Sequence, residues 1–157
     1  MNIGDKIPEI LGIDASGKEI KRSDFEGKKL IIYFYPKDNT PGCTAEACSF
    51  RDNYETFLKL GYVVIGVSKD TEASHQKFTA KYDLPFILIA DTDHRLCEEF
   101  GVWRKKKMAG REYMGIVRTS FVADENGIVT DVVSKVNTKD ASAQLFSILD
   151  GRDSVNP

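Results

Sequence analysis

Two cysteines, Cys43 and Cys48, lie five residues apart and follow a short stretch that contains two prolines. Thr40 can serve as the N-cap of a helix, and Pro41 fits the first helical position. Cys43 is therefore predicted to lie in the first helical turn, where free backbone N–H groups and the positive end of the helix dipole favour an anion. Because the thiolate is the nucleophilic form of cysteine, this placement indicates a reactive thiol.

The alternative for Cys43 is an ordinary buried cysteine that follows a turn. Its separation from Cys48 is not that of a Cys-x-x-Cys redox pair or of a zinc site. Five residues of helix rise about 7.5 Å, which exceeds the Cα separation of about 4.4–6.8 Å in a disulfide. The two thiols can therefore bond only if the start of the helix unwinds. The third cysteine, Cys97, lies beside Leu96 and Phe100 and is expected to be buried and inert.

Other polar residues give weaker signals. His75 and His94 are isolated in helical stretches, and neither is required as a base. A zinc site built from the cysteines and a histidine lacks ligand spacing, so no metal is predicted. The basic run Arg104–Lys107 falls in Val102–Gly115, the longest stretch predicted to be irregular. It is most simply a solvated loop, and the alternative is a docking site for an acidic reductase.

Length and composition exclude several classes of protein. The 157 residues, with 41% hydrophobic and 29% charged side chains, suit one globular domain spanning residues 1–157. With 22 basic and 24 acidic residues the net charge is −2, so nucleic acid is not an expected partner. No apolar run approaches the roughly 20 residues that cross a bilayer, so no membrane association is predicted. The first residues show no secretory signal, and the predicted compartment is the cytoplasm.

The strands that must position these thiols can be read from short apolar runs. The continuous run Leu30–Tyr35 predicts a central strand covered on both faces. Similar runs follow at Tyr62–Ser68, Phe86–Ala90 and Thr119–Ala123. Two hairpins are also predicted, one at Ile10–Ile13 and Glu19–Lys21, and one in which Asn126-Gly127 joins Thr119–Ala123 to Ile128–Val133.

The intervening stretches have helical spacing. The predicted helices are Cys43–Leu60, ending before Gly61, and then Thr71–Tyr82, His94–Phe100 and Thr138–Leu149. Residues after Gly151 are expected to fray. The element order is thus a β-hairpin followed by β, α, β, α, β, α, β, β and α. This order predicts an α/β fold with a central mixed sheet flanked by helices.

The pattern Pro36-x-x-x-Thr40-x-x-Cys43 resembles the active-site signature of peroxiredoxins. The longer stretch FYPKDNTPGCTAEACSFRD, from Phe34 to Asp52, is similar to the bacterioferritin comigratory protein, or Q-type, subfamily. Further matching stretches are Asp24-Phe25-x-Gly27-Lys28, Gly66-Val67-Ser68-x-Asp70, Phe100-Gly101-Val102-Trp103 and Arg118-Thr119-Ser120-Phe121. The likeness covers nearly the whole chain and implies a thioredoxin-like fold with an N-terminal β-hairpin extension.

The resemblance implies a role for each matching residue. Cys43 would be the peroxidatic cysteine, which attacks a peroxide oxygen and becomes a sulfenic acid. Thr40 would hydrogen-bond the peroxide and the thiolate, and Pro36 would shield the intermediate from water. Arg118 aligns with the family's active-site arginine, whose charge stabilises the thiolate and the breaking O–O bond.

Two further residues are carried over in the same way. Cys48 matches the resolving cysteine found in part of the Q-type subfamily, where it condenses with the sulfenate of the same chain. Glu46 lies where the family has an acidic or amide residue that would orient the arginine. Its alternative reading is a first-turn carboxylate that the helix dipole favours.

The resemblance thus implies a thiol peroxidase that reduces hydrogen peroxide and organic hydroperoxides without a metal or prosthetic group. The implied electron donor is thioredoxin, with glutaredoxin as the alternative, and the implied oligomeric state is a monomer. Two other functions stay open at this point. One is a general thiol-disulfide oxidoreductase, which the missing Cys-x-x-Cys disfavours. The other is a non-catalytic thioredoxin-fold binding or chaperone module with inert thiols.

Overall fold

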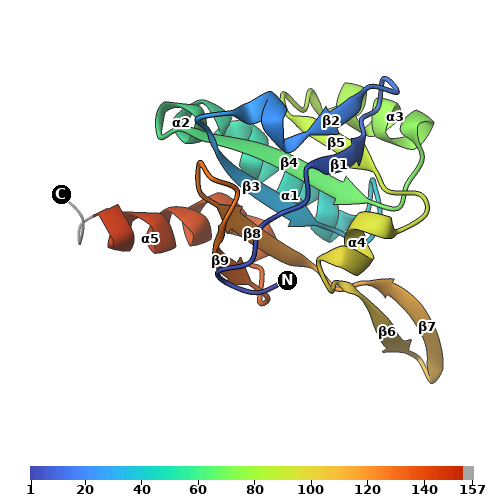
Figure 1. Ribbon diagram of the computed structural model, residues 1–157. Helices are drawn as coiled ribbons and strands as arrows, with labels where there is room; N and C mark the ends of the chain where they lie inside the picture. The colour runs from blue at the N-terminus through green and yellow to red at the C-terminus, as the bar shows by residue number, and fades with distance from the viewer. Residues whose placement is uncertain (154–157) are drawn as a thin grey trace.

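The computed structural model describes residues 1–153 and the side chains of residues 1–149. Its main sheet has five strands in the order β5-β4-β3-β8-β9 (Figure 1). These strands are β3 (Lys29–Phe34), β4 (Tyr62–Ser68), β5 (Ile87–Ala90), β8 (Thr119–Ala123) and β9 (Val129–Val133). The first three are mutually parallel, whereas β8 and β9 are antiparallel to their neighbours, so the sheet is mixed as predicted.

Strand β3 is the central strand, which confirms the prediction from its continuous apolar run. Its side chains alternate between two hydrophobic clusters because successive residues of a strand point to opposite faces. Ile31 and Tyr33 join one cluster, and Leu30, Ile32 and Phe34 join the other. A strand covered on both faces needs apolar residues along its buried length, as this one has from Leu30 to Phe34.

Five α-helices accompany the sheet in the described chain, together with short 3₁₀ turns at Arg22–Phe25 and Thr138–Asp140. The helices are α1 (Pro41–Asp52), α2 (Tyr54–Lys59), α3 (Glu72–Tyr82), α4 (Arg95–Glu99) and α5 (Ala141–Asp153). Buried side chains of α1, α2, α3 and α5 share the cluster of Tyr33, whereas α4 and the N-terminal hairpin pack in the cluster of Phe34. The helices thus flank both faces of the sheet.

The prediction of one helix over Cys43–Leu60 is wrong in one respect, because the helix breaks at Asn53. The side-chain amide of Asn53 donates to the carbonyl of Ser49 at 2.8 Å, a local bond that competes with the helical ladder. The predicted end before Gly61 is confirmed, since Gly61 has a φ of 87°. Helix α5 continues to Asp153, and the rest of the predicted frayed end, residues 154–157, lies outside the described residues.

Both predicted hairpins are present. Strands β1 (Ile10–Ile13) and β2 (Glu19–Lys21) pair as a separate antiparallel ribbon at the N-terminal side. Strands β8 and β9 join through the turn that contains Gly127, where the Asp124 carboxylate accepts the backbone N–H of Asn126 at 2.9 Å and of Ile128 at 3.0 Å. An aspartate that binds the backbone ahead of it is typical of such turns.

The prediction that Val102–Gly115 is irregular is wrong. This stretch forms β6 (Trp103–Met108) and β7 (Arg111–Ile116), a hairpin that projects from the body of the molecule (Figure 1). Its basic side chains are exposed on both faces of the ribbon, so the sequence lacks the alternation that predicts a strand. The turn uses Ala109 and Gly110, both with positive φ, and alanine gives no signal for that conformation.

No helix in the described part of the chain is long and apolar enough to cross a membrane.

Candidate active site

Cys43 lies at the third position of α1, directly after the loop that follows the carboxyl end of β3. Thr40 is the N-cap residue and Pro41 the first helical residue, as the sequence predicts. The Thr40 hydroxyl does not cap the helix but donates to the carbonyl of Lys37 at 2.9 Å. The first-turn N–H groups therefore have no side-chain cap, and they lie beside the thiol, which is only 1% exposed. Free amides at a helix start favour a thiolate there.

Arg118 reaches this thiol from the position directly before β8, the strand that pairs with β3. Thr119, the first residue of β8, pairs with Phe34, the last residue of β3. This register brings Arg118 to the end of β3, where the chain turns toward Cys43. Its Nη2 lies 3.3 Å from Cys43 Sγ, which is hydrogen-bond distance for sulfur. The guanidinium thus supplies a fixed positive charge next to the sulfur.

Glu46 holds the other arm of the same guanidinium. Arg118 Nη1 donates to Glu46 Oε1 at 2.6 Å, and the Glu46 side chain is fully buried. Burial raises the pKa of the Glu46 carboxyl to about 7, and the neighbouring Arg118 charge only partly opposes this shift. For Arg118, burial lowers the pKa, but Glu46 and Cys43 outweigh it and the net shift is upward. The arginine therefore stays charged and bridges the carboxylate and the thiol.

Two residues near this group were not found by sequence reasoning. A Cβ added at Gly42 would lie 3.3 Å from Arg118 Nη2, so glycine leaves room for the guanidinium to approach α1. Tyr33 is fully buried, and its hydroxyl, like Glu46 Oε2, has no hydrogen-bond partner among the residues that the structure describes. Burial raises the Tyr33 pKa well above its usual value, and the nearby Glu46 and Cys43 charges raise it further. In the sequence, only the Pro41-Gly42 dipeptide pointed to Gly42, and no signal pointed to Tyr33.

Cys48 lies in the same continuous helix as Cys43 and is half-buried. It borders an open groove of about 460 Å³ that Ser49, Asp52 and Lys139 also line. All three cysteines are unpaired thiols. Because α1 is intact between Cys43 and Cys48, its rise keeps them about 7.5 Å apart along the axis.

Pro36 and Cys97 are the remaining residues that the sequence singled out. Pro36 is half-buried in the loop after β3. Cys97 is fully buried in α4. Its pKa is raised far above the ordinary value, mainly by burial and to a smaller extent by hydrogen bonding to Asp91. This agrees with the expectation of an inert thiol. Within the described residues, no three His, Cys, Asp or Glu side chains gather in a way that could hold a metal ion.

Comparisons with known proteins agree with this geometry. Residues 3–132 match the AhpC/TSA family. The chain is 46% identical over 149 residues to peroxiredoxin Bcp of Bacillus subtilis, with 95% of each chain covered. It is 40% identical over 138 residues to peroxiredoxin Bcp of Escherichia coli, with 88% of each covered.

Solved structures give the same result. Peroxiredoxin Q of Xanthomonas campestris aligns with a TM-score of 0.83 at 35% identity, covering 89% of each chain. PrxQ of Xylella fastidiosa aligns with a TM-score of 0.89 at 30% identity, covering 98% of each chain. The chain therefore belongs to the AhpC/TSA family. Within it, these relatives identify a peroxiredoxin of the Bcp or Q type, a thiol-dependent peroxidase that acts on peroxides and is recycled by a thiol reductant. The predicted resemblance and the thioredoxin-like fold are confirmed.

Proposed function

We propose that the chain is an atypical two-cysteine peroxiredoxin in which Cys43 attacks the peroxide and Cys48 resolves the product within the same chain. The observation that carries the first part is the contact between Arg118 and the buried Cys43 sulfur at the start of α1. An uncapped helix start and a guanidinium together stabilise a thiolate more than either group alone.

The first step is nucleophilic attack. The Cys43 thiolate attacks one peroxide oxygen, the O–O bond breaks, and Cys43 becomes a sulfenic acid while the other oxygen leaves as water or alcohol after taking a proton. Arg118 stabilises the negative charge on the breaking bond. Thr40 orients the peroxide through its hydroxyl, and Pro36 limits the access of water.

The second step forms the disulfide. The Cys48 thiol attacks the Cys43 sulfenic sulfur, water leaves, and a Cys43–Cys48 disulfide forms after the first turn of α1 unwinds. Thioredoxin then reduces the disulfide through a mixed disulfide and takes up the oxidising equivalents, with glutaredoxin as the alternative donor. The groove beside Cys48 supports such a thiol exchange, because it leaves that edge of α1 open to a partner.

Two further properties belong to this proposal. An intrachain resolving cysteine needs no second subunit, which supports a monomer as the working form. Three cysteines, an odd number at low density, support a reducing compartment, and therefore the cytoplasm.

Thiol titration tests the proposal directly. One equivalent of hydrogen peroxide should remove two of the three thiols within seconds, and mass spectrometry of the digested protein should find Cys43 linked to Cys48 within one chain. Loss of one thiol only, or a link between two chains, would contradict the intrachain mechanism. The reduced thioredoxin and glutaredoxin systems, compared in NADPH-coupled turnover, identify the donor.

A further inference from the structure

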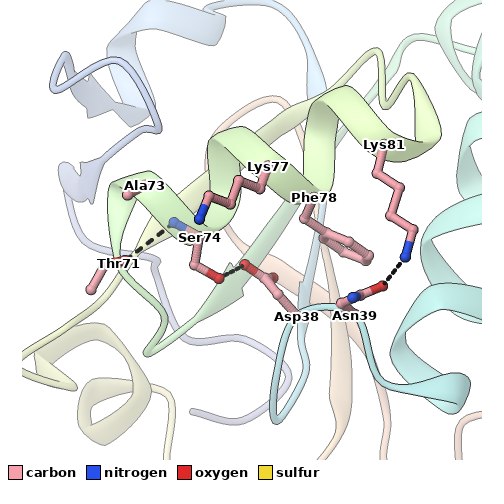
Figure 2. Close-up of a pocket in the computed structure, with 8 residues that line it drawn as sticks. All are labelled: Asp38, Asn39, Thr71, Ala73, Ser74, Lys77, Phe78 and Lys81. Atoms are coloured by element: carbon pink, nitrogen blue, oxygen red, sulfur yellow. Dashed lines mark hydrogen bonds between the residues drawn. The ribbon is translucent and has the colours of Figure 1, made fainter.

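A second polar cluster surrounds Asp38, in the loop between β3 and α1. The Asp38 carboxylate accepts three hydrogen bonds from side chains: Tyr35 Oη at 2.6 Å, Ser74 Oγ at 2.8 Å and His75 Nδ1 at 2.7 Å. Its backbone N–H donates to Asp70 Oδ2 at 2.8 Å. Figure 2 shows the Asp38 carboxylate directed at Ser74 on α3. One loop residue is thus tied to Tyr35, which directly follows β3, to the turn before α3 and to α3 itself.

His75 extends this attachment to the sheet. Its ring is fully buried, and Nε2 lies 3.0 Å from the carbonyl oxygen of Ile89 on β5. A carbonyl only accepts, so Nε2 donates to it. Burial opposes ionisation of Asp38, but the hydrogen bonds from His75 and Tyr35 outweigh it and lower the Asp38 pKa. Asp38 is therefore a carboxylate, and Nδ1 donates as well. The buried ring thus joins the loop to β5 through hydrogen bonds at both of its nitrogens.

The next residue is held separately. Asn39 has a φ of 60°, a left-handed conformation that asparagine tolerates better than most residues. Its Oδ1 lies 3.2 Å from Lys81 Nζ and 3.3 Å from Tyr82 Oη, both at the end of α3. Figure 2 shows this contact at the opposite end of α3 from the Asp38–Ser74 contact. Two consecutive loop residues are thus attached to α3 through their side chains.

Hydrogen bonds, rather than close packing, make this attachment. A hollow of about 340 Å³ lies between the loop and α3, with Lys77 and Phe78 among its walls (Figure 2). On the other side of Asn39 the chain is weakly held: the Thr40 side chain does not cap α1, and Gly42 has a low helix propensity. Because the Thr40 hydroxyl bonds back to Lys37, the boundary between the held loop and the less supported first turn of α1 falls after Thr40.

We propose that His75 is a positioning residue for the peroxidase reaction. Through its bond to Asp38, and together with Asn39, it fixes residues 36–39 so that unwinding of α1 begins after Thr40 and leaves Pro36 in place. This inference rests on the proposed roles of Cys43 and Cys48. The held loop keeps the site assembled for the peroxide step, while the loose first turn opens for the disulfide step.

Two substitutions of His75 separate the two bonds of its ring. In His75→Asn the amide nitrogen replaces Nδ1, so the bond to Asp38 is kept and the bond to Ile89 is lost. In His75→Gln the longer side chain reaches Ile89 and the bond to Asp38 is lost. Both variants replace the imidazole ring by an amide and are close in size, so each serves as the other's control.

The proposed role of His75 predicts different behaviour for the two variants in the reduced protein. In His75→Gln, amide exchange at residues 37–39 should accelerate by about tenfold or more, because their opening no longer breaks the bond to Asp38. The rate constant of sulfenic acid formation should fall about tenfold as the reacting groups lose alignment, while disulfide formation is not slowed. His75→Asn should keep both rates within about threefold of the wild type.

Three results would overturn the proposal: faster exchange at residues 37–39 with an unchanged peroxide step, no change in either measurement, or the same response in both His75 variants. If the His75 variants fail to fold, Asn39→Gly tests the second attachment of the loop, since glycine accepts the positive φ and lacks the bonds to Lys81 and Tyr82; an unchanged peroxide step would contradict the proposal. Lys77→Ala, in the same hollow, is its control. Exchange is read without turnover, so a failure of the Cys43 assignment would be seen separately in Cys43→Ser.

Discussion

Arg118 Nη2 lies 3.3 Å from Cys43 Sγ, although seventy-five positions separate the two residues in the chain. The contact depends on the pairing of β8 with β3, which places Arg118 at the end of the strand that leads to Cys43. The same guanidinium is held by the buried carboxylate of Glu46, so its position is fixed before a peroxide arrives.

Cys43→Ser should abolish peroxidase activity and leave the fold intact, because serine keeps the size of the side chain but provides no thiolate. Steady-state consumption of hydrogen peroxide measures the activity, and far-UV circular dichroism checks the fold. Turnover above a few per cent of the wild-type rate would remove Cys43 from its role.

Arg118→Met should slow the reaction with peroxide by about 10²-fold, if the loss of its charge costs about 3 kcal/mol of transition-state stabilisation. Stopped-flow measurement of the second-order rate constant tests this value. The matched control is Arg111→Met, an exposed arginine in the β6–β7 hairpin that should react like the wild type. Equal rates for the two variants would show that the Arg118 charge is not used.

Glu46→Gln should change how stability depends on pH. Burial raises the folded-state pKa of Glu46 from 4.5 to about 7, so between these values the folded protein keeps a proton that the unfolded chain has lost. The free energy of unfolding of the wild type therefore falls as pH rises through this window, by an amount on the order of 1–3 kcal/mol, and is constant above it.

The glutamine variant has no proton to lose, so this contribution should be absent. Denaturant titrations at pH 5 and pH 8 measure it as the difference between wild type and Glu46→Gln. The variant should be less stable relative to the wild type at pH 5 than at pH 8. A pH-independent difference would mean that Glu46 titrates at its ordinary pKa.

Cys48→Ser should become sensitive to overoxidation. Without a thiol to trap the sulfenic acid, a second peroxide can convert Cys43 to the sulfinic acid. Intact-mass measurement at increasing peroxide should show two added oxygen atoms at concentrations where the wild type shows only the loss of two hydrogens. Equal sulfinic acid formation in both proteins would argue against Cys48 as the resolving residue.

Disulfide formation should also open the start of α1. Amide exchange across Thr40–Arg51 should be faster in the oxidised than in the reduced protein, because the helix must unwind to bring Cys43 to Cys48. Equal protection in the two states, with the disulfide confirmed by mass, would contradict this unwinding.

Cys97 should not react with iodoacetamide in the folded, reduced protein, because its thiol is fully buried and its pKa is raised. Peptide mapping after alkylation should find label on Cys48 and none on Cys97, whereas unfolding in guanidinium should expose all three thiols. Cys97→Ala should retain full peroxidase activity. Labelling of Cys97 at a rate like that of Cys48 would contradict its placement in the core.

The sequence alone determined the features that depend on neighbouring residues. Thr40 and Pro41 specify a helix start, and this places Cys43 in the first turn. The continuous apolar run of β3 specifies a strand buried on both faces, and Asn126-Gly127 specifies a hairpin. In each case a few adjacent side chains restrict the backbone conformation or the burial of the segment. The restriction is strong enough for the feature to be predicted from the sequence.

Only the tertiary structure decided the contacts between distant segments. The family resemblance pointed to Arg118, but the pairing of β8 with β3 sets its distance from Cys43. His75 looked isolated in the sequence because its partner, Asp38, lies thirty-seven positions away. The β6–β7 hairpin was missed since basic side chains lie on both its faces and mask the alternation of a strand. These features depend on which segments pack together, and local backbone preferences carry no information about that.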